Sequence, residues 1–378
     1  MTHVLKRVSL SLSLSLSLSL SLSLSLSLSV GTPKHRRVMA GAVEGEHFVG
    51  KRASELRGLL SLRHPMQHGI VNDWADQERV WQHCYGELRA QAKEHPLLIT
   101  EAPLNPRAQR ERAAELLFEA FGVPALFVSQ QAILSLYASG RTTGLVLDCG
   151  AGTSSATPVF EGFALPHAIE RVDLAGRDVT LHLQRLLRRA GYTFRTSAEL
   201  EVVRDVKESL CFVALDAAKA ESSGASSAAA AVAAGGADAA RPQQYRLPDG
   251  QLIELGAERF RAPEILFRPS LVGDESHGVA DCVASAVRRA DLELRRPLWG
   301  NIVLSGGTTL LPGFGERLLH ELKALGGDVK INISAPKERR FSTWMGGSIL
   351  ATLGTFKQMW VLRKEYEDEG SSVVNRFF

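Results

Sequence analysis

Two glycine-rich turns constrain this chain most, because each directly follows a short apolar run. The first, residues 147–153, reads Leu-Asp-Cys-Gly-Ala-Gly-Thr, and the second, residues 304–309, reads Leu-Ser-Gly-Gly-Thr-Thr. Glycine lets backbone N–H groups approach an anion with no Cβ in the way, and the end of a strand gives that anion a rigid platform. One such turn alone is more often only a tight turn. Two of them favour a nucleotide held between two lobes.

The length of the chain agrees with two lobes, because 378 residues exceed what one hydrophobic core usually serves. A hydrophobic fraction of 45% and a charged fraction of 22% are typical of a globular protein. The 44 basic residues nearly balance the 41 acidic ones. We therefore expect no nucleic-acid partner.

Four cysteines are spaced too widely for the close pairs that zinc and redox motifs need, and we expect them to be reduced packing residues of a cytosolic protein. They are Cys84, Cys149, Cys211 and Cys282.

The N-terminus alternates Ser and Leu without a break over residues 9–29. Such alternation places every leucine on one face of an extended strand. A translated thymine–cytosine dinucleotide repeat encodes this pattern, and we favour that origin. A targeting segment is the alternative, since Lys6 and Arg7 precede the run, although no small-residue cleavage site follows it. A membrane span is disfavoured because alternating serine halves the hydrophobicity, so we expect no membrane insertion.

Three segments, residues 95–106, 131–144 and 342–351, closely resemble the signatures of the actin superfamily. The resemblance runs from about residue 30 to residue 378. Residues 314–319 and 330–336 are more similar to the centractin subfamily, the actin-related proteins of dynactin. Other segments, such as residues 85–89, are similar to conventional actin.

The resemblance implies an α/β fold of the two-lobed actin-like ATPase type, shared with sugar kinases and the seventy-kilodalton chaperones. Each lobe is then a mixed sheet flanked by helices. An Ala/Ser/Gly-rich stretch within the large lobe is expected to be a disordered loop. The expected boundaries are 1–30 for a tract outside the fold, 31–138 with 340–378 for the small lobe, 31–64 for its outer subdomain with a mobile loop, 139–339 for the large lobe, 175–263 for its outer subdomain, and 217–241 for the disordered loop.

Local signals mark two helices. Asn105 as N-cap, Pro106 at the first helical position and Gly122 beyond the end frame one of them. The second begins with the capping box of Thr196 and Glu199. On sequence alone, charged residues of that second helix are predicted to point outward.

The candidate site combines residues after the strands with residues that the resemblance implies. Asp148 is expected to orient the water shell of Mg²⁺, and the amides of residues 150–153 to face the phosphates. The resemblance implies that Gln131 positions the attacking water, and it gives Asp148 and Gln131 the catalytic roles. The nucleotide-binding set is Asp148, Gly150, Ala151, Gly152, Thr153, Arg204, Lys207, Glu208, Gly306, Gly307, Thr308 and Arg340. A solvated helix face is the alternative for Lys207 and Glu208.

The chain also departs from the family pattern. Cys149 and Ala151 stand in a turn that is Asp-Ser-Gly-Asp-Gly in actins, so a second aspartate is absent. Ser155 replaces a histidine that helps to polarise water, and serine is a poor proton acceptor. The first phosphate loop, Asp-x-Gly-Ser-Gly followed by lysine, has no counterpart in residues 1–30. We therefore expect weakened binding of ATP/ADP and Mg²⁺ and at most weak hydrolysis.

These expectations favour an actin-like cytoskeletal protein of the cytoplasm that binds ATP and assembles into short filaments as a dynactin-type scaffold. Its implied partners are further copies of itself, dynactin subunits and capping proteins. Conventional actin is one alternative. A degenerate or truncated actin-related protein without nucleotide binding, acting only as an interaction subunit, is the other.

Overall fold

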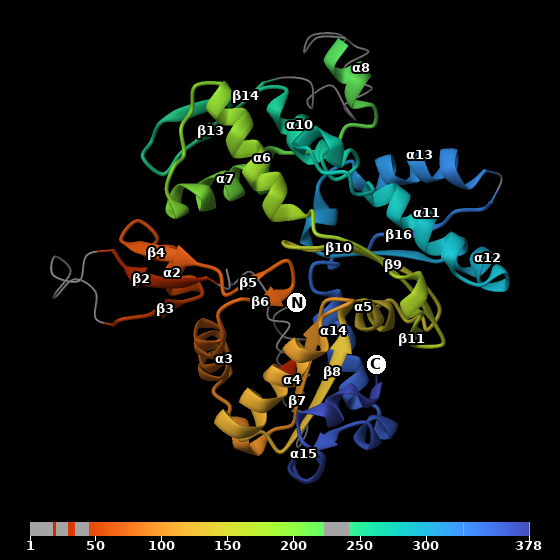
Figure 1. Ribbon diagram of the computed structural model, residues 1–378. Helices are drawn as coiled ribbons and strands as arrows, with labels where there is room; N and C mark the ends of the chain where they lie inside the picture. Colours follow the sequence, from red (N-terminus) through yellow and green to blue (C-terminus); the bar gives the residue numbers. More distant parts are fainter. Residues whose placement is uncertain (1–17, 20–28, 35–44, 223–241, 328, 378) are drawn as a thin grey trace.

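The computed structural model describes residues 18–19, 29–34, 45–222, 242–327 and 329–377, which form two lobes (Figure 1). The small-lobe sheet has the strand order β1-β7-β8-β17, and the large-lobe sheet has the order β11-β10-β9-β15-β16, with β12 attached to β10. Their strands are β1 (Leu18–Ser19), β7 (Leu97–Glu101), β8 (Ala125–Gln130), β9 (Gly144–Cys149), β10 (Ser154–Phe160), β11 (Phe163–Ala164), β12 (Glu170–Val172), β15 (Ile302–Ser305), β16 (Ile333–Ser334) and β17 (Val361–Leu362).

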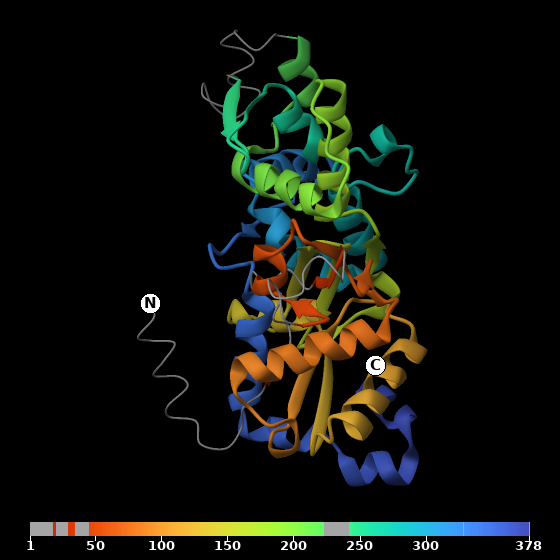
Figure 2. The same cartoon turned by 90° about the vertical axis from the view of Figure 1, so that its left-hand side faces the viewer.

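Three smaller sheets complete the lobes, and the side view shows the lobes stacked one above the other (Figure 2). The small lobe carries the outer sheet β3-β2-β4 and the hairpin β5-β6, and the large lobe carries the hairpin β13-β14. These strands are β2 (Val30–Pro33), β3 (Phe48–Val49), β4 (Leu60–Arg63), β5 (Met66–Gln67), β6 (Ile70–Val71), β13 (Gln243–Arg246) and β14 (Leu252–Leu255).

Helices flank both central sheets (Figure 1). The α-helices are α2 (Lys51–Glu55), α3 (Trp74–Leu88), α4 (Arg107–Glu115), α5 (Gln131–Ala138), α6 (Gly176–Arg189), α7 (Ser197–Leu210), α8 (Ala217–Ser222), α10 (Glu258–Glu264), α11 (Val279–Arg289), α12 (Leu292–Gly300), α13 (Phe314–Gly326), α14 (Ser342–Thr352) and α15 (Arg363–Glu369). A π-helical turn, η2 (Leu116–Ala120), extends α4, and short 3₁₀ turns are η1 (Ala92–Glu94), η3 (Pro166–Ala168), η4 (Pro269–Val272), η5 (Gly307–Leu310), η6 (Gly354–Gln358) and η7 (Ser371–Phe377).

The central strands are continuous apolar runs because both faces of each sheet are covered. All residues of β9 and β15 are buried, and β8 is buried except at its last residue. Strands β7 and β8 are parallel, as are β9 and β15, which is the pairing that such runs favour. Each lobe has its own hydrophobic cluster, one around β9 and β15 and one around β7 and β8.

Helices α5 and α14 pack against each other where the two lobes meet (Figure 1). Glycine makes this close packing possible, because a Cβ built on Gly346 would lie 1.7 Å from the carbonyl oxygen of Leu134. Any side chain at this position would push the helices apart. Helix α5, whose first residue follows β8 directly, also packs against β9 and β15 of the large lobe.

The predicted helix signals agree with the structure in most respects. Gly122 has a positive φ of 70° beyond the end of the first helix, as expected. The capping box of Thr196 and Glu199 is present and confirms the start of α7. The N-cap of α4 is Pro106 rather than Asn105. Asn105 is drawn away because its side-chain amide donates a hydrogen bond to Glu101 (3.0 Å).

Three predicted irregular segments fall partly outside the described residues. Within the Ser-Leu tract, Leu18–Ser19 form β1 and pair in parallel with Leu97–Leu98 of β7. The rest of the tract up to residue 28 is not described. Within the predicted disordered loop, α8 occupies Ala217–Ser222, and residues 223–241 are not described. The predicted mobile outer loop runs from residue 36 to residue 50, and its residues 36–44 also lie outside the described ones.

Among the described residues, no helix is long and apolar enough to cross a membrane.

Candidate functional site

The two glycine-rich turns lie side by side. Strands β9 and β15 are parallel neighbours, and Asp148 is in register with Ser305. Both strands therefore end at the same edge of the sheet, and each continues directly into its turn. The crevice outside the carboxyl ends of parallel strands is where open α/β sheets bind ligands. The pairing of the strands thus creates one composite site from segments more than a hundred residues apart.

The second turn approaches the first so closely that only glycine fits. Gly306 has a φ of 87°, and a Cβ built on it would lie 2.3 Å from the carbonyl oxygen of Cys149. The hydroxyl of Thr308 donates a hydrogen bond to the carbonyl oxygen of Gly150 (2.7 Å). The turns therefore support each other through backbone contact and one side-chain hydrogen bond.

The N-terminus of α6 closes the site from a third side. The N–H of Gly176 donates to the carbonyl oxygen of Gly150 (3.1 Å), and the N–H of Arg177 donates to that of Ala151 (2.8 Å). A Cβ on Gly176 would lie 2.4 Å from the hydroxyl oxygen of Thr308. Sequence reasoning missed Gly176, although a glycine at the start of a strongly amphipathic helix was the available signal.

Lys207 points into the site rather than outward. Its ammonium group donates a hydrogen bond to the carbonyl oxygen of Gly176 (2.8 Å), and only 9% of the residue is exposed. Burial lowers the pKa of Lys207. The outward orientation predicted for the α7 charges is therefore wrong at this residue, because α7 turns that face toward α6. A desolvated cation beside two glycine turns is suited to an anionic group.

The other predicted charges of α7 stay near the surface. Arg204 forms an ion pair with Glu201 (2.5 Å) and lies 3.8 Å from Glu208. Glu208 is exposed. Neither has a described contact with the glycine turns, and Lys207 alone of the three reaches the N-terminus of α6, which contacts the first turn. On the opposite turn, exposed Arg340 lies against Gly307, whose built Cβ would be 4.0 Å from the Arg340 side chain.

Asp148 supplies the acidic group of the site. It is 9% exposed, and burial raises the pKa of its carboxyl group, while a hydrogen bond from Ser305 acts in the opposite direction. A cation beside this carboxylate would offset the cost of burying its charge. The described residues contain no group of three or more His, Cys, Asp or Glu side chains that could hold a metal. The carboxylate of Asp148 is an oxygen donor of the kind that suits Mg²⁺, which keeps several water ligands and binds through one or two carboxylates.

One backbone amide of the first glycine-rich turn is already hydrogen-bonded within the turn. The N–H of Gly150 donates to the carbonyl oxygen of Thr153 within the turn (3.0 Å). This amide is therefore not available to a phosphate. The sequence predicts that the amides of all four residues 150–153 face the phosphates, and Gly150 differs from that prediction. Ala151 is exposed at the tip of the turn.

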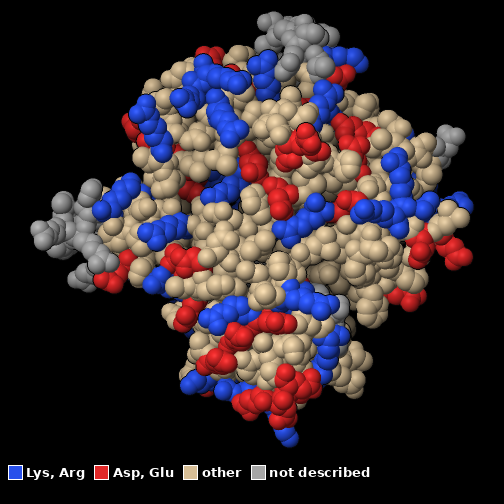
Figure 3. All heavy atoms as spheres, in the orientation of Figure 1, with Lys and Arg blue, Asp and Glu red and all other residues tan. Residues whose placement is uncertain are grey.

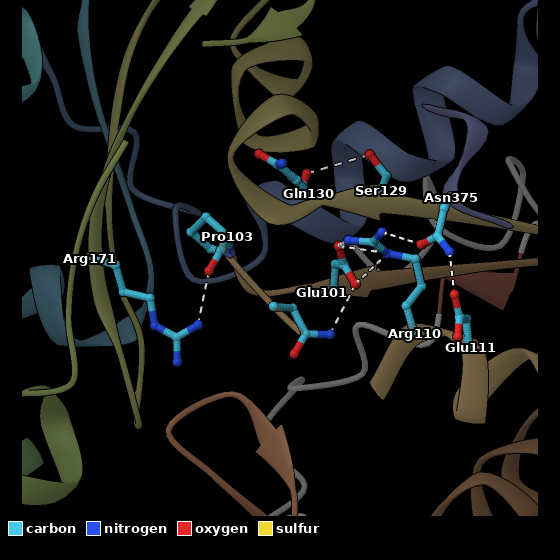
Figure 4. Close-up of polar contacts among 9 residues, drawn as sticks. Glu101, Pro103, Arg110, Glu111, Ser129, Gln130, Arg171 and Asn375 are labelled. Carbon is cyan, nitrogen blue, oxygen red and sulfur yellow. Dashed lines mark hydrogen bonds and ion pairs between the residues drawn. The ribbon is translucent and has the colours of Figure 1, made fainter. Parts of the chain in front are cut away.

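A loop of the small lobe contacts the same turn. The ring Nδ1 of His68 lies 2.9 Å from the carbonyl oxygen of Gly152, and a Cβ on Gly152 would lie 3.1 Å from the backbone N of His68. Arg171, on β12, donates to the carbonyl oxygen of His68 (2.6 Å). It also donates to that of Pro103 (2.9 Å), a bond drawn in Figure 4. These contacts join the lobes across the site. Sequence analysis did not assign Arg171 to the site.

A comparison with protein families gives the context of this geometry. The family model described as Actin matches residues 23–378. The chain belongs to the actin family. An "Actin-like protein" from Neurospora crassa is 55% identical over 351 residues, which cover 92% of this chain and 90% of the Neurospora protein. The predicted actin fold is thereby confirmed, whereas the centractin subfamily stays a prediction.

Proteins of the actin family generally bind a nucleotide with Mg²⁺ and are generally cytoskeletal. In this actin-family chain, Ser155 is buried and lies opposite Asp148 in the antiparallel pair of β9 and β10. Directly opposed residues share one face of a sheet, so the two side chains are neighbours. Gln131 starts α5, one turn before Ser135, whose hydroxyl lies 3.0 Å from that of Ser305. This places α5 beside the edge that carries the turns.

Proposed function

We propose that this actin-family chain binds ATP or ADP with Mg²⁺ between its lobes and assembles into short filaments as a scaffold of the dynactin type, with at most weak hydrolysis. One observation carries the nucleotide proposal. Two glycine-rich turns at the ends of parallel strands converge with the buried ammonium of Lys207 and the buried carboxyl of Asp148. These features suit a metal-bound polyphosphate. The glycine turns let the backbone approach its oxygens, the desolvated ammonium can pair with its charge, and the buried carboxyl can face its metal ion.

In this proposal, different residues of the site bind the phosphates, the nucleoside and the metal ion. Lys207 and the amides of residues 151–153 hold phosphate oxygens, and Gly306 with Thr308 forms the turn beneath the nucleoside end. Asp148 orients the water ligands of Mg²⁺, and Arg340 lies over the adenine. Bound Mg²⁺ would neutralise phosphate charge and the charge of Asp148 together. The first phosphate loop of actins has no counterpart in residues 1–30, which weakens this binding.

Weak hydrolysis follows from the side chains beside Asp148. Gln131 is the proposed water-positioning residue, and Ser155 stands where actins carry a histidine. A serine hydroxyl can hydrogen-bond to water but accepts a proton poorly at neutral pH. Ala151 at the tip of the turn adds no second carboxylate.

The filament part rests on family membership. The scaffold part rests on the similarity of residues 314–319 and 330–336 to centractin. The proposed partners are further copies of the chain, dynactin subunits and capping proteins, in the cytoplasm. The alternative is an interaction subunit that binds no nucleotide, and the loss of the first phosphate loop favours it.

Thermal unfolding of the full chain with and without Mg·ATP tests the nucleotide site. Binding only to the folded state stabilises it by about 2.7 kcal/mol when the ligand is at roughly 100 times its Kd. We expect Lys207→Met and Asp148→Asn to abolish the shift in melting temperature, and the exposed control Lys323→Met to retain it. A wild-type chain that shows no shift with ATP, ADP or Mg²⁺ would favour the nucleotide-free subunit.

Pelleting and negative-stain microscopy test assembly separately. We expect short filaments that depend on protein concentration. Monomers only, across salt and nucleotide conditions, would contradict the filament part while leaving the nucleotide part standing. Phosphate release measured beside conventional actin tests the hydrolysis part, and equal or faster turnover by this chain would overturn it.

A further inference from the structure

A pocket lies in the outer part of the large lobe, away from the glycine-rich turns. Its cavity of about 450 Å³ is at the C-terminal end of α6. Three of its lining residues are arginines, and the lining contains neither Asp nor Glu. The lining residues are Gln184, Arg185, Arg188, Thr193, Phe194 and Arg195. The volume lies within the range of pockets that bind ligands.

The three arginines of this pocket are not paired. Arg185, Arg188 and Arg195 are exposed, and in the described part of the chain none of their guanidinium groups has a hydrogen bond or an ion pair. The carboxylate of Glu199, close to them in sequence, instead accepts from the backbone N–H groups of Arg195 and Thr196. The fold therefore provides cations here without internal counter-charges.

Stabilisation of the C-terminal end of α6 does not explain all three arginines of the pocket. Basic side chains in the last turn of a helix complement its dipole, which accounts for Arg188 and Arg189. Arg185 lies one turn earlier, and the effect falls off within the last turn. Arg195 lies outside the helix altogether. Two of the pocket's arginines therefore need another reason to face the same cavity.

The walls of the pocket are held in place by hydrogen bonds. The side-chain amide of Gln184 donates to the carbonyl oxygen of Phe194 (2.6 Å), which ties the segment after α6 back onto the helix. The N–H of Tyr192 donates to the carbonyl oxygen of Leu187 (2.9 Å). The hydroxyl of Tyr192 accepts from the N–H of Glu254 on β14 (3.4 Å). The backbone that carries the arginines is thus fixed before any ligand arrives, which reduces the entropy cost of binding.

The surroundings are also electropositive. Lys and Arg side chains gather over α6 and the neighbouring β13–β14 hairpin in the upper left of the space-filling view (Figure 3). Half-buried His182 has a lowered pKa, first because of burial and then because Arg185 and Arg189 are close. A concentrated positive field attracts anionic partners and speeds their encounter.

We infer that this pocket binds an acidic peptide segment of a partner protein, with Arg185, Arg188 and Arg195 pairing with its carboxylates and Phe194 packing against its apolar atoms. Guanidinium groups match carboxylates in a two-pronged geometry. The cations flank a cavity with an aromatic wall, which suits an extended segment better than a single small anion. This inference does not depend on nucleotide binding.

Fluorescence anisotropy of a short dye-labelled polyglutamate peptide with the full chain tests the inference. We expect Arg185→Glu/Arg195→Glu to weaken binding about tenfold or more. The control Arg107→Glu/Arg296→Glu changes the net charge equally at exposed arginines on α4 and α12 and should change binding by less than about twofold. Both variants should keep the wild-type melting temperature within a few degrees and the wild-type response to Mg·ATP.

Several outcomes would overturn the inference. Equal losses in the two variants would mean general charge attraction without a site. No binding by the wild-type chain at low salt would remove the peptide ligand. Inorganic phosphate that displaces the labelled peptide as effectively as unlabelled peptide does would assign the pocket to a small anion.

Discussion

The hydroxyl of Thr308 links the two glycine-rich turns, because it donates to the carbonyl oxygen of Gly150 (2.7 Å). Thr308→Val keeps the shape and leaves that carbonyl with one partner fewer. We expect a loss of about 1–2 kcal/mol of unfolding free energy, measured by urea titration. The control Thr352→Val removes a hydroxyl whose bond stays within the exposed end of α14, and it should cost less than about 0.5 kcal/mol. Equal costs would show that the turns do not depend on this bond.

Ala151 is exposed at the tip of the first turn, where actins have an aspartate. Ala151→Asp places a second carboxylate near the proposed metal without disturbing packing. If the proposed site is correct, Mg·ATP should bind about tenfold more tightly, which corresponds to about 1.4 kcal/mol. Titration with a fluorescent ATP analogue in Mg²⁺ and in chelator measures the effect. Ala151→Asn controls for size, and a gain that persists in chelator would contradict the metal role.

The sequence predicted the site residues that local signals mark. It did not predict those that depend on contacts between residues far apart in the chain. Asp148 and the glycines were found because strand and turn signals are local. The helical pattern alone placed Lys207 on the outer face of its helix, since the approach of α6 to α7 is not visible in such a pattern, and only the family resemblance put it in the nucleotide-binding set. The contacts of Arg171 with His68 and Pro103 span 103 and 68 residues. No local pattern encodes such pairs.

At the scale of elements, a buried polar cluster attaches the C-terminal turn η7 to α4 (Figure 4). Arg110 pairs with Glu101 at the end of β7 (2.5 Å) and donates to the side-chain oxygen of Asn375 (2.7 Å). The side chains of Arg110 and Glu101 are only 5% and 9% exposed. The Asn375 amide donates to Glu111 (2.6 Å), so one arginine connects a strand, a helix and the chain end.

Arg110→Met would leave Glu101 buried without its cation. We expect a loss of roughly 3–5 kcal/mol of unfolding free energy, measured by chemical denaturation. Arg112→Met, on the same helix, breaks an exposed pair with Glu115 (2.8 Å) and should cost less than about 1 kcal/mol. A small loss in Arg110→Met would show that the cluster is solvated and does not hold the chain end.

The contact between β4 and α7 is predicted to be sensitive to acid. His64 follows β4 and lies 3.9 Å from Glu201 of α7, and its pKa is lowered to about 4 by burial, then by Arg177 and Arg204. The folded chain thus holds a neutral imidazole, while the unfolded chain protonates near pH 6.5. The stability from this group is complete above pH 6.5 and is lost as the pH falls toward 4.

His64→Gln should remove this dependence. At pH 5 we expect the wild-type chain to have lost roughly 1–2 kcal/mol more than the variant, relative to pH 7.5. Denaturant titrations at both pH values measure the difference. Glu201, whose pKa is raised by burial, is present in both proteins and titrates in both profiles. Parallel pH profiles would show that His64 is protonated in the folded state.

Element prediction from the sequence succeeded where a single residue decides the geometry. Gly122 and the box of Thr196 and Glu199 marked helix boundaries correctly, because caps act within one turn. The N-cap of α4 moved to Pro106 because Glu101 engages Asn105, a contact made only after β7 and α4 meet. The pairing of Leu18–Ser19 with β7 could not be predicted, since every second residue of the repeat offers the same strand pattern.

At the scale of the whole molecule, each lobe has its own main core, and the described parts of the lobes are joined by an apolar cluster of α5 with β9, β10 and β15 and by polar contacts. The outer edges meet through Arg57 and Asp205 (3.1 Å) and through the N–H of Leu62 and the hydroxyl of Ser197 (3.3 Å). Closer to the turns, Arg171 donates from the large lobe to two carbonyl oxygens of the small lobe. Its side chain is 10% exposed, so these bonds are largely shielded from water.

Arg171→Met should therefore uncouple the lobes rather than unfold either one. Each hydrogen bond from a charged donor contributes about 1.5–3 kcal/mol, and both cross the same interface. We expect calorimetry to show a broadened transition whose calorimetric enthalpy exceeds its van't Hoff enthalpy, the sign that units unfold separately. Arg289→Met is the matched control, because it breaks an ion pair with Glu170 (3.0 Å) within the large lobe. One sharp transition, shifted equally in both variants, would mean that Arg171 stabilises the large lobe locally and that other contacts, such as the packing of α5 against β9, couple the lobes.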